Sequence, residues 1–245
     1  MNIMIFILGT IVASFLNAIV YRIEKQFPIK KMLFTRSECE SCKKEVVWFE
    51  LFPIISWIFL KGKCSQCGRK INIYYPISEL MLGIGFVIVF NNSQNPLISL
   101  FFLSILFSLS YFDYLSKSIP QFLTNALVFL GLIYFGFNGF PYQSLIVLGV
   151  VTIIYFVLIM FVKKWKNGIG FGDFLIFLFF ALTLSLEQFV SLFVIYSYIT
   201  GIYAIFLVIK NRKDLKIYIP QVPFLTLAYI LSFVLTNTIV SFLGI

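Results

Sequence analysis

The sequence predicts an all-α polytopic membrane protein with about eight transmembrane helices, both termini outside and a small loop domain in the cytosol. Three observations carry this prediction. The chain of 245 residues is 60% hydrophobic and only 12% charged, which is far from the balance of a soluble domain. The apolar residues fall into runs near the length of a membrane span. The positively charged residues, finally, are confined to alternate gaps between those runs.

Each apolar run is a candidate transmembrane helix, because about 20 apolar residues cross a bilayer and flanking residues extend shorter runs. The first run is expected to stay in place as an anchor, since its first cations, Arg22 and Lys25, follow it. The run at 174–186 is short, and together with the next one it is expected to form a hairpin that turns near Glu187. The eight runs cover residues 2–21, 76–90, 97–115, 121–138, 143–162, 174–186, 188–209 and 222–243.

The distribution of Lys and Arg predicts the orientation of the chain. Of 19 such residues, 11 lie between Arg22 and Lys70, and the other eight lie at 117, 163–166 and 210–216. Eight spans place all of these gaps on one side, and positively charged loops face the cytosol. The long first loop is therefore expected inside and both termini outside. The formal net charge of +9 is explained by orientation and by attraction to anionic membrane lipid, without a nucleic-acid partner.

The four cysteines of the chain all lie in the first loop, as two Cys-x-x-Cys pairs. Cys39 and Cys42 are followed after 21 residues by Cys64 and Cys67, and a glycine turn follows in "CSQCG". Two such pairs can direct four thiolates at one tetrahedral ion, and zinc fits this geometry best. The alternative is a pair of disulfides, which a reducing cytosol disfavours. We therefore predict a structural zinc site that stabilises a small domain.

The chain contains no histidine, which excludes a Ser–His–Asp triad and a histidine general base. Carboxylates are then the leading candidates for acid–base chemistry. Two of the ten acidic residues are embedded in apolar sequence: Asp113, one turn before the end of the third run, and Asp173, at the start of the sixth. Both are expected at the cytosolic side of the membrane, at matching depth. A close carboxylate pair shares one proton, so one member can activate water while the other protonates an amide.

Each aspartate also has a simpler interpretation. Asp173 has the position of an N-cap for the sixth helix, and Asp113 is near enough to the membrane surface to be hydrated from the cytosol. Gly170 and Gly172, directly before Asp173, allow a sharp turn and leave room for a substrate strand. Intramembrane carboxylates are nonetheless candidates for function, and two of them at one depth favour the catalytic interpretation. Sequence periodicity alone does not show that they meet.

The order of these features resembles the type IV prepilin peptidase family. "SFLNAIVYR" (14–22) is similar to the first-helix signature of the family, and residues 36–80 look like its zinc-bearing segment. "FDYLSKSIP" (112–120), with Asp113 and Pro120, resembles the first catalytic stretch, and "GFGD" (170–173) the second. "IPQVPFLTLAY" (219–229), with Pro223, resembles the opening of the last helix. Departures from the usual pattern stand at three positions: Gln121, Leu175 and Val222.

The resemblance implies an aspartic endopeptidase of the bacterial plasma membrane. Such enzymes cut the basic leader from type IV prepilins and pseudopilins after a glycine, at the cytosolic face. Asp113 and Asp173 would be the catalytic pair. Members with the cysteine-bearing loop also methylate the new N-terminus with S-adenosylmethionine. No methyl-donor site is readable here, and the candidate residues are not distinguished from one another: Glu38, Glu40, Glu45, Glu50 and Glu79.

The resemblance also implies three parts: a first transmembrane helix (1–22), a cytosolic four-cysteine zinc domain (23–75) and a transmembrane peptidase domain (76–245). Other membrane proteases with a Gly-x-Gly-Asp motif would keep both aspartates but have no reason for the zinc loop. A transporter would use intramembrane carboxylates as a proton or cation relay. An assembly factor would use the zinc loop to bind a partner and would not depend on either aspartate.

Overall fold

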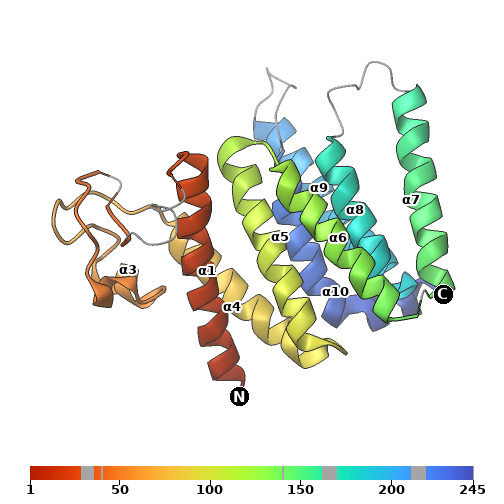
Figure 1. Cartoon of the computed structure of the whole chain (residues 1–245), viewed down its shortest axis with the longest axis horizontal. Coiled ribbons are helices and arrows are strands. Elements are labelled where there is room, and N and C mark those ends of the chain that lie inside the picture. The colour runs from red at the N-terminus through yellow and green to blue at the C-terminus, as the bar shows by residue number, and fades with distance from the viewer. Residues whose placement is uncertain (29–35, 40, 140, 162–169, 211–218, 245) are drawn as a thin grey trace. The chain divides into compact units, whose positions relative to one another are not determined.

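The computed structural model of the chain describes residues 1–28, 36–39, 41–139, 141–161, 170–210 and 219–244, and only the backbone at 158–161. These residues form helices, turns and loops, with two isolated β-bridges. The chain divides into two compact units, Met1–Tyr111 and Phe112–Ile245 (Figure 1). The prediction of an all-α protein is confirmed.

Every expected membrane span corresponds to a helix. Five helices are long and apolar enough to cross a membrane by length and composition: α1 (Asn2–Glu24), α4 (Tyr74–Asn92), α5 (Pro96–Ser116), α9 (Leu186–Lys210) and α10 (Val222–Leu243). Two apolar helices are shorter, α6 (Gln121–Phe137) and α8 (Phe171–Thr183), as is the part of α7 (Tyr142–Phe161) whose side chains are described. The chain is thus a multi-pass membrane protein.

The hairpin expected to turn near Glu187 turns slightly earlier. Helix α8 ends at Thr183, and α9 begins at Leu186, so that Glu187 lies in the first turn of α9. Helix α8 also begins earlier than the apolar run, at Phe171, with Gly170 as its N-cap. The orientation prediction depends in part on cations at 163–166 and 212–216, which lie outside the described residues.

In the first unit, α1 and α4 approach closely because both carry a glycine where they cross. A Cβ on Gly9 would lie 2.9 Å from the Cα of Gly83, and a Cβ on Gly83 would lie 2.8 Å from Phe6 and Thr10. Small residues let membrane helices approach in this way. Near the other end of α1, the buried Asn17 amide donates a hydrogen bond to Ser78 of α4 (2.9 Å). This unit also contains two short helices, η1 (Trp48–Leu51) and α3 (Ile55–Phe59).

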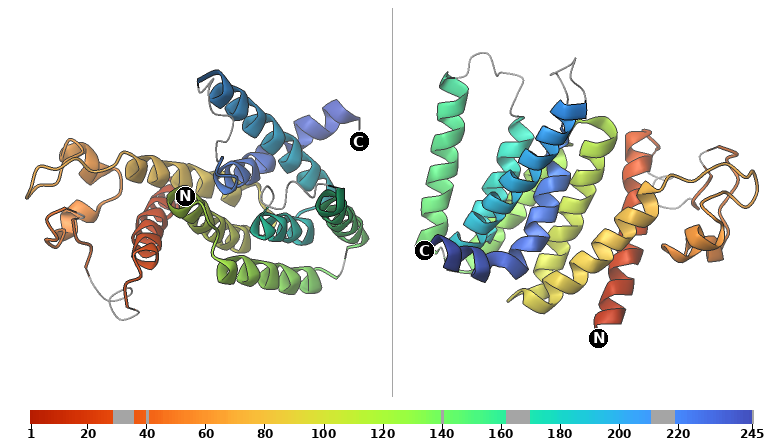
Figure 2. Two further views of the ribbon diagram at one scale, coloured as in Figure 1. Left: turned by 90° about the horizontal axis from the view of Figure 1, so that it is seen from above. Right: turned by 180° about the vertical axis from the view of Figure 1, so that it is seen from behind.

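In the second unit, aromatic side chains pack the helices together around α8. A Cβ on Gly131 of α6 would lie 3.0 Å from Phe179 of α8. Phe180, also in α8, stacks on Tyr229 of α10 with ring centroids 5.6 Å apart. Figure 2 shows the helices of this unit from above and from behind. Helix α8 is therefore held on two sides, and this packing positions its first turn.

The close approach of α1 and α4 makes Gly9 sensitive to added volume. We expect Gly9→Ala to lower the free energy of unfolding by about 1–3 kcal/mol, because the methyl group would meet backbone that cannot rotate away. Gly149→Ala in α7 is the matched control, since a Cβ there would meet nothing within 4 Å. Thermal unfolding of both purified variants in detergent would measure the difference. Equal midpoints for the two variants would contradict the packing argument.

Candidate functional site

Asp113 lies in the last turn of α5 and is almost completely buried, with 1% of its surface exposed. Its Oδ2 accepts a hydrogen bond from the backbone N–H of Val222 (3.0 Å). Val222 is the first residue of α10, so this N–H has no partner within its own helix. The carboxylate therefore caps α10 from another helix, at the end where the helix dipole favours negative charge.

Asp173 lies in the first turn of α8, as its third residue, and is half-buried. The N-cap is Gly170, in an extended conformation (φ −67°, ψ 141°), so the alternative of Asp173 as the N-cap is wrong. Its carboxylate instead reaches back to the backbone N–H of Gly170. A Cβ on Gly170 would lie 3.5 Å from Asp173 Oδ2, which is an ordinary van der Waals contact, so the carboxylate lies directly beside the N-cap.

The structure brings the two aspartate-bearing stretches together. A Cβ on Gly172 would lie 3.3 Å from the side chain of Ile119, so the glycine allows the two stretches to touch. Asp113 also acts electrostatically on Asp173. Both residues belong to the second unit. Asp113 and Asp173, sixty residues apart in sequence, thus belong to one local site. Sequence periodicity alone did not establish this.

Two residues that the sequence analysis missed belong to the same site. Asp113 and Asp173 both act electrostatically on Tyr196 of α9, and the Tyr196 hydroxyl donates a hydrogen bond to Gln221 Oε1. Gln221 directly precedes Val222, the residue whose N–H binds Asp113. Gln221 lies within the stretch 219–229 that the sequence analysis quoted. Tyr196 lies in no motif, and no local signal marks it.

The two prolines of the predicted motifs both begin helices. Pro120 is the N-cap of α6 and directly follows Ile119, which packs against Gly172. Pro223 occupies the first turn of α10, where its lack of an N–H costs nothing. Pro120 thus begins a helix next to the stretch that contains Asp173, and Pro223 begins one next to Asp113.

The four cysteine sulfur atoms form one cluster in the first unit. All lie within 4.8 Å of one another, and no pair is joined as a disulfide. The Sγ atoms of Cys39 and Cys67 are 3.9 Å apart. A tetrahedral zinc–thiolate site with bonds of about 2.3 Å places its sulfur atoms about 3.8 Å apart. The cluster therefore fits a metal ion such as zinc, and the disulfide alternative is wrong.

The two Cys-x-x-Cys pairs have the same backbone geometry. In the first, the Lys43 N–H donates to the Cys39 carbonyl (3.0 Å); in the second, the Gly68 N–H donates to the Cys64 carbonyl (2.9 Å). Lys43 and Gly68 both have positive φ, 58° and 69°. The glycine turn predicted in "CSQCG" is confirmed. The first pair makes the same turn with a lysine, which sequence reasoning did not anticipate because this φ favours glycine.

The thiols of the cluster perturb one another. Hydrogen bonding from the backbone N–H of Cys42, above all, lowers the pKa of Cys39 to about 6. The backbone N–H of Arg69 lowers the pKa of Cys67, but desolvation and the other three cysteines together raise it to about 11. A metal ion would supply the positive charge that favours the thiolate form of crowded sulfur ligands.

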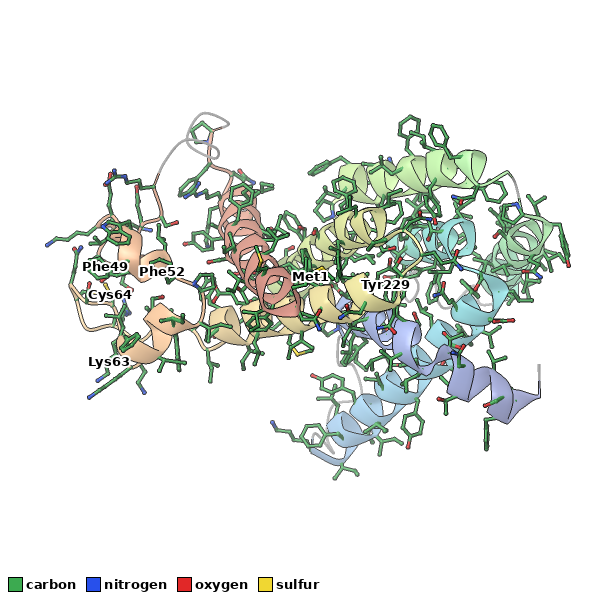
Figure 3. The ribbon with its side chains drawn as sticks, turned by 90° about the horizontal axis from the view of Figure 1, so that it is seen from below. Met1, Phe49, Phe52, Lys63, Cys64 and Tyr229 are labelled. Carbon is green, nitrogen blue, oxygen red and sulfur yellow. The ribbon has the colours of Figure 1, made fainter. Side chains whose placement is uncertain are left out.

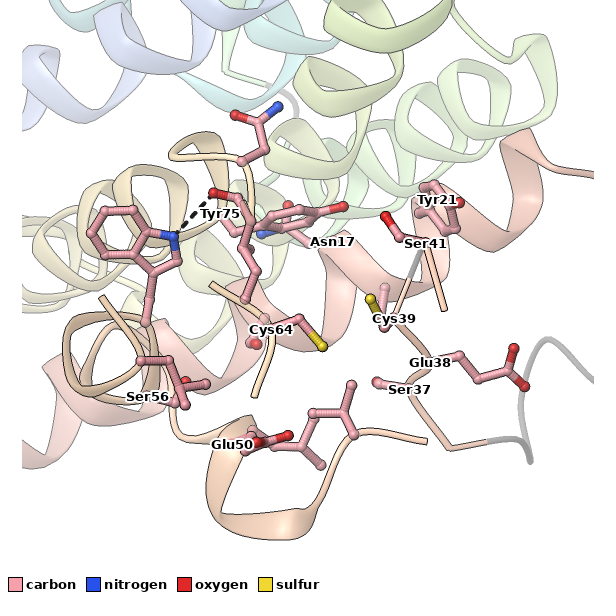
Figure 4. A pocket seen from close by; sticks show the side chains of 18 of the residues that line it. Asn17, Tyr21, Ser37, Glu38, Cys39, Ser41, Glu50, Ser56, Cys64 and Tyr75 are labelled. Carbon is pink, nitrogen blue, oxygen red and sulfur yellow. Dashed lines mark hydrogen bonds between the residues drawn. The ribbon is translucent and has the colours of Figure 1, made fainter. Parts of the chain in front are cut away.

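A pocket of about 290 Å³ lies beside this cluster, within the first unit. Its walls come from α1, from the cysteine-bearing loop and from the start of α4 (Figure 4). Acidic, basic and aromatic side chains line it together, among them Glu50, Arg22 and Tyr75. Asn17 also lines the pocket; it is 1% exposed, and its Oδ1 has no hydrogen-bond partner among the described residues. A buried acceptor without a partner is costly, so a bound donor group would satisfy it.

The structure separates the five glutamates that the sequence left undistinguished. Glu38, Glu50 and Glu79 line the pocket. Glu79 is buried, and its carboxylate accepts a hydrogen bond from the Ile54 N–H (2.7 Å). Glu45 is absent from the pocket and forms an exposed ion pair with Arg36 (3.5 Å). Glu40 lies outside the described residues.

Both halves of the chain match models of known protein families. Residues 7–93 match the bacterial peptidase A24 N-terminal domain. Residues 100–205 match the type IV leader peptidase family. The chain belongs to the type IV leader peptidase family. In this leader peptidase, the first match contains the four cysteines and the second contains both aspartates.

Two characterised relatives are similar over long stretches. The prepilin leader peptidase/N-methyltransferase of Vibrio cholerae serotype O1 is 28% identical over 244 residues, which cover 93% of this chain and 94% of the relative. The protein of the same name from Neisseria gonorrhoeae is 29% identical over 196 residues, which cover 69% of this chain and 68% of the relative. No solved structure matches the leader peptidase chain.

The sulfur geometry predicts how much metal the protein holds. We expect purified protein to contain about one zinc ion per chain, and Cys67→Ser to lower that content to less than about half, because three thiolates hold the ion less tightly than four. Ser65→Ala changes a residue between two ligands without removing a sulfur, and serves as the control. Elemental analysis of both variants measures the content. Full zinc in Cys67→Ser would contradict a four-cysteine site.

Proposed function

We propose that this protein is a membrane aspartic endopeptidase that removes the basic leader from type IV prepilins or pseudopilins, cutting after a glycine at the cytosolic membrane face. Both relatives carry the name prepilin leader peptidase, which supports the substrate class. The observation that carries the mechanism is the electrostatic interaction between two carboxylates from distant stretches, Asp113 and Asp173, in a chain without histidine.

In this proposal the two aspartates hold one proton between them. The ionised carboxylate takes a proton from a water molecule while the oxygen of that water attacks the carbonyl carbon of the scissile bond. The protonated carboxyl gives its proton to the amide nitrogen, and the carbon–nitrogen bond breaks. The Val222 N–H at Asp113 and the Gly170 N–H at Asp173 would hold each carboxylate in place. Tyr196 and Gln221 would close the site from α9 and α10.

The proposed orientation follows from the distribution of cations. With positively charged loops in the cytosol, the last turn of α5 and the first turn of α8 both lie at the cytosolic face of a bacterial plasma membrane. Both chain termini then lie outside. The proposed parts of the chain remain 1–22 as first helix, 23–75 as zinc domain and 76–245 as peptidase domain. A precursor would keep its basic leader in the cytosol and its apolar helix in lipid, with the junction level with the aspartates.

Removing either carboxylate should abolish cleavage. We expect Asp113→Asn and Asp173→Asn each to slow cleavage of a co-expressed prepilin by at least about 100-fold, because an amide can neither take nor give the proton. Mass spectrometry of the product's N-terminus measures the cleaved fraction. Glu187→Gln, an exposed carboxylate at the other end of α8, is the matched control. Full cleavage by either Asp variant would overturn the proposed mechanism.

We also propose that the first unit methylates the new N-terminus with S-adenosylmethionine, bound in the pocket beside the cysteine cluster. Both relatives are named N-methyltransferase as well. The methyl donor carries a positively charged sulfonium, an amino-acid end with both charges, and an adenine ring. The pocket offers carboxylates, arginines and aromatic rings for these three parts, and the free Oδ1 of Asn17 is an acceptor for an amino or hydroxyl group.

The zinc domain would form a wall of this pocket. Cys39 and Cys64, one from each pair, both line it, so a bound zinc ion would hold the two sides of that wall together. S-adenosylmethionine would supply a methyl group to the neutral N-terminal amine of the substrate, and the amine would then lose a proton. Glu50 and Glu79, which line the pocket, are the nearby carboxylates that could receive this proton.

Methylation and cleavage should therefore be separable. We expect Glu50→Gln to lower the methylated fraction of the product about 10-fold, since a charge-assisted contact contributes about 1.5–3 kcal/mol, while cleavage stays unchanged. The amide oxygen can still accept the Val47 N–H that Glu50 binds now (3.2 Å). Glu45→Gln, outside the pocket, is the control. If Glu45→Gln and Glu50→Gln methylate equally, the pocket is not the donor site.

A further inference from the structure

The cysteine-bearing loop contains a strongly apolar stretch, residues 47–59, of which the proposed reactions use only the Glu50 carboxylate. It consists of η1 and α3 with the residues that join them, and no residue of either helix is buried. We call it the apolar segment. Trp48 is 72% exposed and Phe59 82% exposed. The other large hydrophobic side chains exposed in the segment are Val47, Phe49, Leu51, Phe52, Ile55 and Ile58.

Such a surface is not stable in water. Soluble surfaces rarely carry a contiguous apolar patch of this kind, and one of this size marks a membrane or a protein partner. The zinc knuckles beside it are charged, with Lys43, Lys44, Lys61 and Lys63 all exposed. Figure 3 shows Phe49 and Phe52 in the same small domain as Cys64, with Lys63 at its outer edge. The loop therefore has an apolar part and a cationic part.

The position of the apolar segment favours lipid as its partner. Helix α3 lies level with the middle of α1, rather than beyond the end of α1 from which the loop departs (Figures 1 and 2). Both helices belong to the first unit. Helix α1 is long and apolar enough to span a membrane. A segment beside the middle of such a helix is at the depth of the hydrocarbon and not of bulk water.

The backbone of the segment is prepared for that environment, where an unpaired N–H is expensive. The Val47 N–H donates to the Glu50 carboxylate (3.2 Å), and the Ile54 N–H donates to the Glu79 carboxylate (2.7 Å). Ile54 has a φ of +62°, which is an outlier for a β-branched residue. The buried Glu79 of α4 thus holds the bend between η1 and α3 in a strained conformation.

We propose that the apolar segment is immersed in the lipid bilayer as a re-entrant element beside α1, so that the loop is not wholly cytosolic. Trp and Phe suit the boundary between headgroups and acyl chains, and neighbouring lysines suit anionic headgroups. Glu79 acts as the positioning residue that ties the segment to α4. This inference is independent of either proposed reaction.

The test uses the fluorescence of Trp48 in full-length protein reconstituted into phosphatidylcholine/phosphatidylglycerol vesicles. The difference between wild type and Trp48→Phe isolates the emission of Trp48. We expect lipids brominated on the acyl chains to quench this emission at least about twofold, because bromine must touch the indole, while aqueous acrylamide has little effect. Phe59→Trp in the Trp48→Phe background moves the probe to the other end of the segment, and the same result is expected there.

Two outcomes would overturn the proposal. Quenching by acrylamide and not by brominated lipid would place the segment in water. Protection from both quenchers would place it against protein, as in a contact with a second copy of the chain. Both quenching measurements need only folded protein in vesicles. The zinc content shows separately whether the loop domain is folded. Neither depends on cleavage or methylation, so failure of the proposed reactions leaves this test unaffected.

Discussion

The hydrogen bond from the Val222 N–H to the Asp113 carboxylate is the contact on which the aspartate site depends. A carboxylate buried to 1% exposure is costly in an apolar helix bundle unless polar groups solvate it. Here the first turn of α10 supplies that solvation, because its N–H groups have no partners within the helix. The same contact joins α5 to α10, and it brings Gln221, the preceding residue, to Tyr196 of α9. These two hydrogen bonds thus connect α5, α10 and α9 at one point.

The same principle applies on a smaller scale at Asp173. Helix α8 begins at Phe171, and the carboxylate of Asp173 in its first turn reaches back to the N–H of the N-cap, Gly170. Gly172 adds a steric condition, since a Cβ there would lie 3.3 Å from the Ile119 side chain, closer than an ordinary van der Waals contact. Each aspartate is therefore held by a helix N-terminus, Asp113 by that of another helix and Asp173 by that of its own. Negative charge shared between the two carboxylates is easier to maintain when each of them lies at the positive end of a helix dipole.

The first unit combines buried polar groups with an exposed apolar surface. Asn17 and Glu79 are buried, one with a free acceptor beside the pocket and the other bound to the backbone of the loop. Both groups sit where α1, α4 and the cysteine loop converge on the pocket. Buried polar groups of this kind specify one arrangement of a domain that has little core of its own. A metal ion bound by the sulfur cluster would have the same effect on the loop, because it would join two distant turns.

The sequence by itself determined the helices, the cysteine cluster and the identity of the two aspartates. Apolar runs predicted every long helix within a few residues, because in lipid only a helix satisfies the backbone over such a length. The Cys-x-x-Cys spacing predicted the cluster, because a single tight turn brings the two sulfur atoms of each pair close together. Tertiary structure decided what periodicity does not encode. It brought Asp113 to Asp173, added Tyr196 and Gln221, and selected Glu38, Glu50 and Glu79 over Glu45 at the pocket. These outcomes depend on how helices far apart in the chain pack, through contacts such as those of Gly172 and Val222, and no local pattern carries that information.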